Sequence, residues 1–201
     1  MTLTKPDPVM AQLSLFDSGE QVLLDDASGR IVLTPDLVDE RTAQTWFDQL
    51  HEHIDWKSGR RVMYEREVDV PRLRSHFGTD DPALPAALRE AMAVVTASVA
   101  APFDSIGLNL YRDHHDSVAP HNDKLGDIVR DQPIALLSLG ATRRMTIRSK
   151  QPPRRVLNVD LEAGSLLLMS WTTQLHYDHA IPKQRTPAEP RISLAFRVRG
   201  G

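Results

Sequence analysis

Residues 134–149 read IALLSLGATRRMTIRS, which is two short runs rich in apolar and β-branched residues on either side of Gly140. Such runs, bounded by a turn residue, predict two short strands. Comparable runs occupy 106–112, 156–161, 165–171 and 192–199, and Pro152, Pro153, Gly164 and Pro187 mark turns between them. Several short strands with no helix between them indicate a β-sandwich or barrel, a class that includes jelly rolls.

Two helices are predicted before this β-rich half. Thr34 and Pro35 predict the start of the first helix, as its N-cap and its first helical residue. The second is predicted over 84–100, and the residues between them, 56–78, predict an arginine-rich loop or irregular hairpin. The expected fold is α+β, with N-terminal helices packed on one sheet of a double-layered antiparallel structure. The first helix has an apolar stripe at helical spacing: Ala43, Trp46, Phe47, Leu50 and Ile54.

The composition limits the class of protein. A length of 201 residues suggests one or two domains, and we expect an N-terminal tail at 1–20 followed by a single domain at 21–201. The absence of cysteine excludes a disulfide scaffold, a thiol nucleophile, an iron–sulfur cluster and a cysteine-ligated zinc site. No apolar run approaches the roughly 18 residues of a membrane span, and no secretory signal is recognisable. We therefore expect a cytoplasmic monomer that does not enter a membrane.

The net charge of −3 is unevenly distributed. Residues 1–40 carry eight acidic and two basic residues, whereas the remainder carries 19 acidic and 22 basic residues. The basic residues fit either a nucleic-acid phosphate footprint or a solvated surface with scattered counterions, and charge alone leaves both open. Two clusters hold many of them: Lys57, Arg60, Arg61, Arg66, Arg72 and Arg74, and Arg143, Arg144, Arg148, Lys150, Arg154 and Arg155.

Five of the eight histidines lie in the β-rich half, and His121 is followed two residues later by Asp123. In an extended chain, residues i and i+2 point to the same side, so this imidazole and carboxylate converge. A third ligand from a distant strand would complete a facial triad of two histidines and one carboxylate, which suits non-haem Fe(II). His179 is the favoured third ligand, and His176 is its competitor.

The run RISLAFR at 191–197 places Arg191, Ser193 and Arg197 on one face of a strand. Arginines on the inner face of a small barrel require an anion, because an unpaired buried charge is unfavourable. A dicarboxylate cosubstrate, held by a guanidinium group, is one candidate. The alternative is a solvent-exposed arginine at a strand end.

Taken together, these motifs resemble the AlkB family of Fe(II)/2-oxoglutarate-dependent dioxygenases, in its branch that repairs alkylated nucleic acids. The resemblance rests on HND at 121–123, the histidine 58 residues later, RISLAFR at 191–197, and Asn109-Leu110-Tyr111, which is similar to the family's Asn-x-Tyr. Residues 56–78 resemble the family's nucleotide-recognition lid. The joint occurrence of these motifs in this order is specific, and the match covers most of residues 30–199.

The resemblance implies a double-stranded β-helix, or jelly roll, in which Fe(II) is held by His121, Asp123 and His179. It implies O2 and 2-oxoglutarate as cosubstrates, with alkylated DNA or RNA as the partner. The implied reaction is oxidative demethylation of an N-alkylated base, which releases formaldehyde, succinate and CO2. The residues implied for 2-oxoglutarate are Asn109, Tyr111, Arg191, Ser193 and Arg197, and those for the substrate are Met63, Tyr64, Arg72, Arg74 and Arg148.

The sequence departs from the family pattern in two places. Ser193 and Ala195 replace the Asn and the Thr or Ser that usually precede Phe-Arg, and Leu125 stands where many repair enzymes place an acidic residue. Two alternatives therefore stay open. One is a 2-oxoglutarate-dependent hydroxylase of a small molecule or a protein side chain, and the other is a barrel that binds nucleic acid or metal without turnover.

Overall fold

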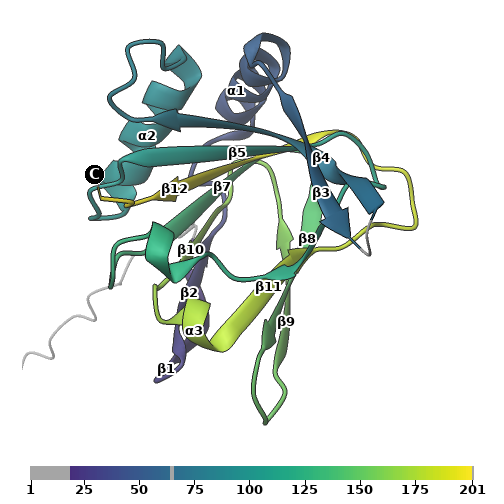
Figure 1. Cartoon of the computed structure of the whole chain (residues 1–201). Helices are drawn as coiled ribbons and strands as arrows, with labels where there is room; N and C mark the ends of the chain where they lie inside the picture. Colours follow the sequence, from purple (N-terminus) through teal and green to yellow (C-terminus); the bar gives the residue numbers. More distant parts are fainter. Residues whose placement is uncertain (1–18, 64–65, 201) are drawn as a thin grey trace, which may run out of the picture.

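The structure is a computed structural model that describes residues 19–63 and 66–200, with the side chains of residues 60–69 left out. Over those ranges the chain is mostly antiparallel β-sheet with few helices, as the sequence predicted (Figure 1). The predicted tail at 1–20 lies outside the described residues except for its last two positions.

Within the described ranges, the larger sheet has eight strands and the smaller has four. In spatial order the larger sheet contains β1 (Gln21–Asp26), β2 (Gly29–Thr34), β10 (Leu166–Met169), β7 (Ile134–Gly140), β12 (Arg191–Arg197), β5 (Ser105–Tyr111), β4 (Arg66–Gly78) and β3 (Lys57–Met63). The smaller sheet contains β6 (Val118–His121), β11 (Tyr177–Ile181), β8 (Arg143–Ser149) and β9 (Val156–Leu161).

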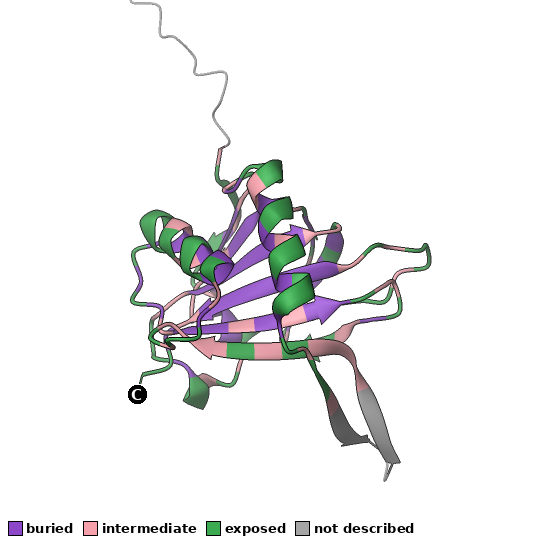
Figure 2. Cartoon of the chain, turned by 90° about the horizontal axis from the view of Figure 1, so that it is seen from above, coloured by how far each residue is buried: buried purple, intermediate pink, exposed green. Residues whose placement is uncertain are grey.

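Helices α1 (Glu40–His53) and α2 (Ala86–Ser98) cover the outer face of the larger sheet (Figure 2). Trp46 and Leu50 of α1 and Leu88 of α2 belong to the same apolar cluster as Leu194 and Phe196 of β12. Full burial of side chains of this size contributes about 1.5–3 kcal/mol each. No helix in the described ranges is both long and apolar enough to span a membrane.

The inner face of the larger sheet packs against the smaller sheet through a second apolar cluster. Leu136 of β7 and Ala195 of β12 meet Met145 and Ile147 of β8 and Ile181 of β11 there. Because side chains alternate along a strand, Arg191, Ser193 and Arg197 share this inner face with Ala195. The residues that the sequence singled out therefore point into the space between the two sheets.

The first helix does not begin where the sequence predicted. Thr34 is the last residue of β2 and pairs with Leu166, so it is not an N-cap. Asp36 has a positive φ of 48°, which is incompatible with a helix. The N-cap is Asp39, whose carboxylate accepts a hydrogen bond from the Thr42 amide at 2.9 Å.

Strands β3 (57–63) and β4 (66–78) pair with each other in antiparallel orientation, and β4 also pairs with β5. The hairpin was thus the better of the two predictions for this segment. The sequence analysis did not predict the hairpin of β1 and β2.

Gly140, which ends β7, must be a glycine. It has a φ of 78°, and a β-carbon there would lie 2.6 Å from the Pro190 carbonyl oxygen and 2.7 Å from the Phe47 ring.

Candidate metal centre and cosubstrate pocket

Two histidines and one aspartate converge between the sheets. His121 ends β6 and pairs directly with His179 of β11, and their ring centroids are 4.4 Å apart. Asp123 follows β6 by two residues, and the potential ligand atoms of all three side chains lie within 4.8 Å of one another. The strand pairing thus brings together two histidines that are 58 residues apart in the sequence, with Asp123 beside them, and His176 is not part of the group.

The charge states of Asp123 and His179 favour metal binding. Burial opposes ionisation of Asp123, but the positive charge and hydrogen bond of Arg197, together with the neighbouring imidazoles, outweigh it and keep the pKa of the carboxyl below its usual value. Burial and the neighbouring His121 lower the pKa of His179 to about 3, so this imidazole is neutral near pH 7. A carboxylate and neutral imidazoles are the forms that bind metal, and this donor set fits Fe(II).

Arg197 contacts Asp123 directly. Its Nε donates to Oδ2 at 2.8 Å and its Nη2 donates to Oδ1 at 3.1 Å. This bidentate geometry aligns the carboxylate, and both side chains are largely buried. Arg197 had been predicted as a 2-oxoglutarate residue, and the structure places it beside the candidate metal ligands.

The loop that carries Asp123 is held by Gln174, which the sequence analysis did not select, and by Lys150, which it placed in a basic cluster. The Asp123 amide donates to Oε1 of Gln174, in the short helix α3 (Thr173–His176), at 2.9 Å. The Lys150 ammonium group donates to Asn122 Oδ1 at 2.8 Å and to the Gln174 carbonyl oxygen at 2.7 Å. These contacts orient the aspartate before any ligand binds, as outer partners of metal sites commonly do.

A small cavity of about 50 Å³ adjoins the histidines. Strands β4, β5 and β12 contribute most of its polar lining, and Val118, Leu136, Met145 and Ile181 contribute an apolar wall beside the two histidines. The predicted cosubstrate residues Asn109, Tyr111, Arg191, Ser193 and Arg197 all line it. Arg72 also lines it and donates from Nε to Asn109 Oδ1 at 2.8 Å.

Arg191 is the strongest indication of an anionic ligand in this cavity. Only 1% of its surface is exposed, and its Nη2 donates to Ser138 Oγ at 2.8 Å. Its Nε and Nη1 have no hydrogen-bond partner among the described residues. Burial lowers the pKa of Arg191 to about 10, which still leaves the guanidinium charged near pH 7. A buried cation with two unused donors is unfavourable unless an anion completes it.

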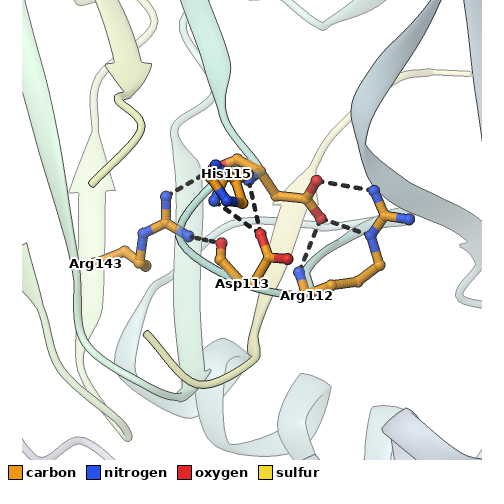
Figure 3. A network of polar contacts seen from close by, with 5 residues as sticks. Arg112, Asp113, His115 and Arg143 are labelled. Atoms are coloured by element: carbon orange, nitrogen blue, oxygen red, sulfur yellow. Dashed lines mark hydrogen bonds and ion pairs between the residues drawn. The ribbon is translucent and has the colours of Figure 1, made fainter. Parts of the chain in front are cut away.

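A second buried arginine lies on the Tyr111 ring. The guanidinium carbons of Arg191 and Arg143 are 5.5 Å and 5.4 Å from its centroid. Arg143 donates to the carbonyl oxygens of Asp113 and Asp116, and so clamps the loop between β5 and β6 (Figure 3). It also donates to the carbonyl oxygen of Pro182, directly after β11. Arg112 reinforces this loop through three hydrogen bonds to the Asp116 carboxylate.

The burial of Arg143 overturns its placement in a solvated or phosphate-binding cluster, because none of its surface is exposed. Ser138 and Gln174 were also missed, and only Ser138 had a usable signal. It is the one polar residue within the apolar run IALLSL, and β7 places it directly opposite Ser193. Nothing in the sequence distinguished Gln174 from an exposed polar residue.

The candidate substrate residues are spread over several environments. Tyr64 and the side chain of Met63 lie outside the described residues. Arg72 lines the cavity, whereas Arg74 lies in a neighbouring groove. Arg148 is exposed on β8 and does not line the cavity, so its contact with substrate stays a prediction.

Comparisons with known proteins agree with this geometry. A family profile described as the 2OG-Fe(II) oxygenase superfamily matches residues 30–197. The chain is 31% identical to alpha-ketoglutarate-dependent dioxygenase alkB homolog 3 of Bos taurus over 188 residues, covering 84% of this chain and 66% of that protein. It is 27% identical to the DNA oxidative demethylase ALKBH2 of Homo sapiens over 176 residues, covering 75% and 66%.

The chain therefore spans just under two thirds of the length of these relatives. The predicted resemblance is confirmed, and the family uses Fe(II), 2-oxoglutarate and O2. The chain belongs to the 2OG-Fe(II) oxygenase superfamily, within its AlkB family.

Proposed function

We propose that this protein is an Fe(II)/2-oxoglutarate-dependent dioxygenase that demethylates N-alkylated bases in DNA or RNA. The observation that carries the proposal is the placement of the His121, Asp123 and His179 donors beside a buried, incompletely bonded Arg191. A divalent metal and a dianionic cosubstrate are the two ligands that these groups would complete. The names of the relatives, a dioxygenase and a DNA demethylase, supply the substrate class.

In this proposal His121, Asp123 and His179 hold Fe(II). The guanidinium of Arg191 meets the distal carboxylate of 2-oxoglutarate, and the Tyr111 hydroxyl and Ser193 are near enough to line the same end of the cavity. Burial raises the pKa of Tyr111, so its hydroxyl keeps its proton and can donate to the carboxylate. Asn109 and Arg197 support the end nearer the metal.

Arg72, in β4 of the β3–β4 hairpin, lines the cavity and donates to Asn109, one of the proposed 2-oxoglutarate residues. We expect the Arg72 side chain to change its position when 2-oxoglutarate binds. Such side-chain changes are common on binding. This hairpin and its flanks, residues 56–78, would act as the lid over the substrate base.

Fe(II), 2-oxoglutarate and O2 supply the oxidation that hydroxylates the N-methyl group, and the cosubstrate becomes succinate and CO2. The hydroxymethyl product then breaks its C–N bond and releases formaldehyde and the repaired base. The chain's own contribution is to orient the reactants and exclude water, for which Leu136, Met145 and Ile181 form a dry wall. A base in a duplex must be flipped out to reach this cavity.

The same family membership supports the finer structural proposals. We infer that residues 21–201 form one domain, that the two facing sheets are a double-stranded β-helix with the N-terminal helices on its larger sheet, and that the protein is a cytoplasmic monomer. Both apolar clusters share strands of the larger sheet, which supports a single domain. The lack of cysteine is compatible with a reducing compartment.

Mass spectrometry tests the function directly. Oligonucleotides that contain methylated adenine, cytosine or guanine are incubated with the protein, Fe(II), 2-oxoglutarate and ascorbate. We expect loss of one methyl mass with formation of succinate, and no reaction by a His121→Ala variant. Succinate formation that is stimulated only by small metabolites or peptides would instead identify the alternative hydroxylase, for which Leu125 is the motivating residue.

A further inference from the structure

The Lys150 side chain reaches the loop that carries Asp123 from the end of β8. Its Nζ donates to Asn122 Oδ1 at 2.8 Å and to the Gln174 carbonyl oxygen at 2.7 Å. Asn122 directly precedes Asp123, and the Gln174 side chain accepts from the Asp123 amide. Both hydrogen-bond partners of the ammonium group therefore adjoin a candidate metal ligand, although Lys150 itself does not line the cavity.

The charge of Lys150 is only weakly offset by the described residues. Its two hydrogen-bond partners are the neutral oxygens of a side-chain amide and a peptide group. In the described part of the chain it has one ion pair, a long one to Asp178 Oδ1 at 3.8 Å. Only 29% of the lysine side chain is exposed, so water screens its field less than that of a surface lysine.

The field of Lys150 extends to the metal ligands. Burial is the main cause of the lowered pKa of His179, but the positive charge of Lys150 also lowers it. The same repulsion acts on any cation placed between the ligands, and it is stronger for a trivalent ion than for a divalent one. Lys150 therefore opposes Fe(III) at this site more than it opposes Fe(II).

Arg197 is a second cation near the ligands, but its charge is already compensated. Its guanidinium forms a bidentate pair with the Asp123 carboxylate, so the pair is close to neutral. Lys150 has no carboxylate partner at hydrogen-bond distance among the described residues. The two cations thus differ in effect, because Arg197 aligns a ligand whereas Lys150 adds positive charge.

We propose that Lys150 keeps the iron bound at this site in the ferrous state. The inference rests on the proposed function for the identity of the metal, and it adds a residue outside the three candidate ligands and the cosubstrate cavity. Oxidation outside turnover removes one electron from Fe(II) and passes it to O2, which leaves as superoxide. A positive charge beside the ligands makes this loss less favourable, so the protein should depend less on an external reductant.

An anaerobic redox titration of the full-length, iron-loaded protein without 2-oxoglutarate tests the inference. Electron paramagnetic resonance measures the Fe(III) present at each potential. The reduction potential reports the affinity of the site for Fe(III) relative to Fe(II), so a displaced loop that weakens both equally leaves it unchanged. We expect Lys150→Gln, which removes the charge but keeps a hydrogen-bond donor, to raise the preference for Fe(III) by at least about threefold. Oxidation of the iron in air should accelerate in the same variant.

Three further variants separate charge from geometry. Lys150→Arg keeps the charge and should restore the wild-type preference. Asn122→Ala keeps the charge but removes a contact of Lys150 with the loop, so the preference should stay unchanged even where both ions bind more weakly. Lys183→Gln, at an exposed lysine after β11, removes the same charge elsewhere and should have no effect.

Equal reduction potentials in the wild type and Lys150→Gln would overturn the inference. An equal shift in Lys150→Arg or Asn122→Ala would also overturn it, because geometry and not charge would then be the cause. Circular dichroism spectra that match the wild type show that the variants are folded.

The outcome separates this inference from the proposed function, because the titration uses neither an oligonucleotide nor 2-oxoglutarate. If the wild type demethylates no methylated oligonucleotide but Lys150→Gln shifts the potential as expected, the function is wrong and the assignment of Lys150 stands. If the wild type demethylates and the two potentials are equal, the function stands and the assignment of Lys150 is wrong.

Discussion

The two faces of strand β12 are both buried, but they differ in chemistry. On the outer face, Ile192, Leu194 and Phe196 are fully buried against the helices. On the inner face, Arg191 and Ser193 are almost as deeply buried, yet both are polar. Burial alone therefore does not indicate what a residue does, because the outer face supplies folding energy and the inner face holds the groups proposed to bind the cosubstrate.

The metal ligands should show the largest separation between stability and activity. Asp123→Ala removes one of three donors and leaves Arg197 without its carboxylate partner. We expect turnover to fall by at least about 10³-fold, as is typical when a group essential to catalysis is removed. Calorimetric titration with Mn²⁺ should show loss of binding, while the circular dichroism spectrum stays that of a folded protein. Retained turnover would contradict the proposed metal site.

A substitution of Arg191 tests whether the inner face of β12 binds 2-oxoglutarate. Arg191→Met removes the charge but keeps much of the volume, so the apparent KM for 2-oxoglutarate should rise by at least about 30-fold, equivalent to about 2 kcal/mol. Ile192→Val, on the neighbouring outer position, is the control and should leave KM unchanged. An unchanged KM in Arg191→Met would place the cosubstrate elsewhere.

A substitution of Leu194 tests whether the outer face of β12 contributes to stability alone. Its side chain is fully buried, and Leu194→Ala should lower the free energy of unfolding by about 2–5 kcal/mol. Urea unfolding measures this loss. At temperatures where the variant is folded, its KM for 2-oxoglutarate should equal that of the wild type, because no ligand contact has changed. Ser193→Ala should show the reverse pattern, with a small change in the free energy of unfolding and weaker binding of 2-oxoglutarate.

The pH dependence of cosubstrate binding follows from the buried guanidinium. The pKa of Arg191 is lowered to about 10, so the group is charged below that pH and loses its proton above it. The Kd for 2-oxoglutarate, which is already fully ionised, should be flat between about pH 7 and 9 and rise by up to about tenfold per unit above 10. The exposed Arg144, whose pKa Asp160 raises, keeps its charge throughout. A Kd that falls with rising pH would contradict this assignment.

The smallest effect is expected for an arginine that faces solvent. Arg144 forms two hydrogen bonds to the Asp160 carboxylate across β8 and β9, at 2.7 Å and 2.8 Å. Both side chains are about half exposed, so water screens the pair. Arg144→Gln should leave both the urea midpoint and the KM within experimental error. A clear shift in either would show that this pair contributes more than exposed pairs generally do.

Short-range patterns in the sequence accounted for much of the site. The i, i+2 spacing of His121 and Asp123, and the alternation from Arg191 to Arg197, depend only on strand geometry, so their convergence could be anticipated. The pairing of His179 with His121 depends on strand order, which the resemblance to the family supplied.

Features that depend on register between distant strands could not be predicted in this way. Arg143 reads as one of six clustered bases, but its strand turns it towards the carbonyl oxygens of two other loops. The start of α1 was misplaced because Thr34-Pro35 satisfies a local rule for helix starts, whereas pairing of Thr34 with β10 prevails. In both cases, tertiary contacts outweighed a local preference.

Gly140 lies between helix α1 and the backbone of Arg191. It pairs with Arg191, and any side chain at this position would collide with Phe47 of α1 and with the carbonyl of Pro190. A repacking of the helix layer at Phe47 would therefore displace the backbone from which the cosubstrate arginine emerges. Substitutions in α1 can therefore change the affinity for the proposed cosubstrate although the helix contacts no part of the cavity. Attempts to stabilise this helix should change Phe47 and Gly140 together or not at all.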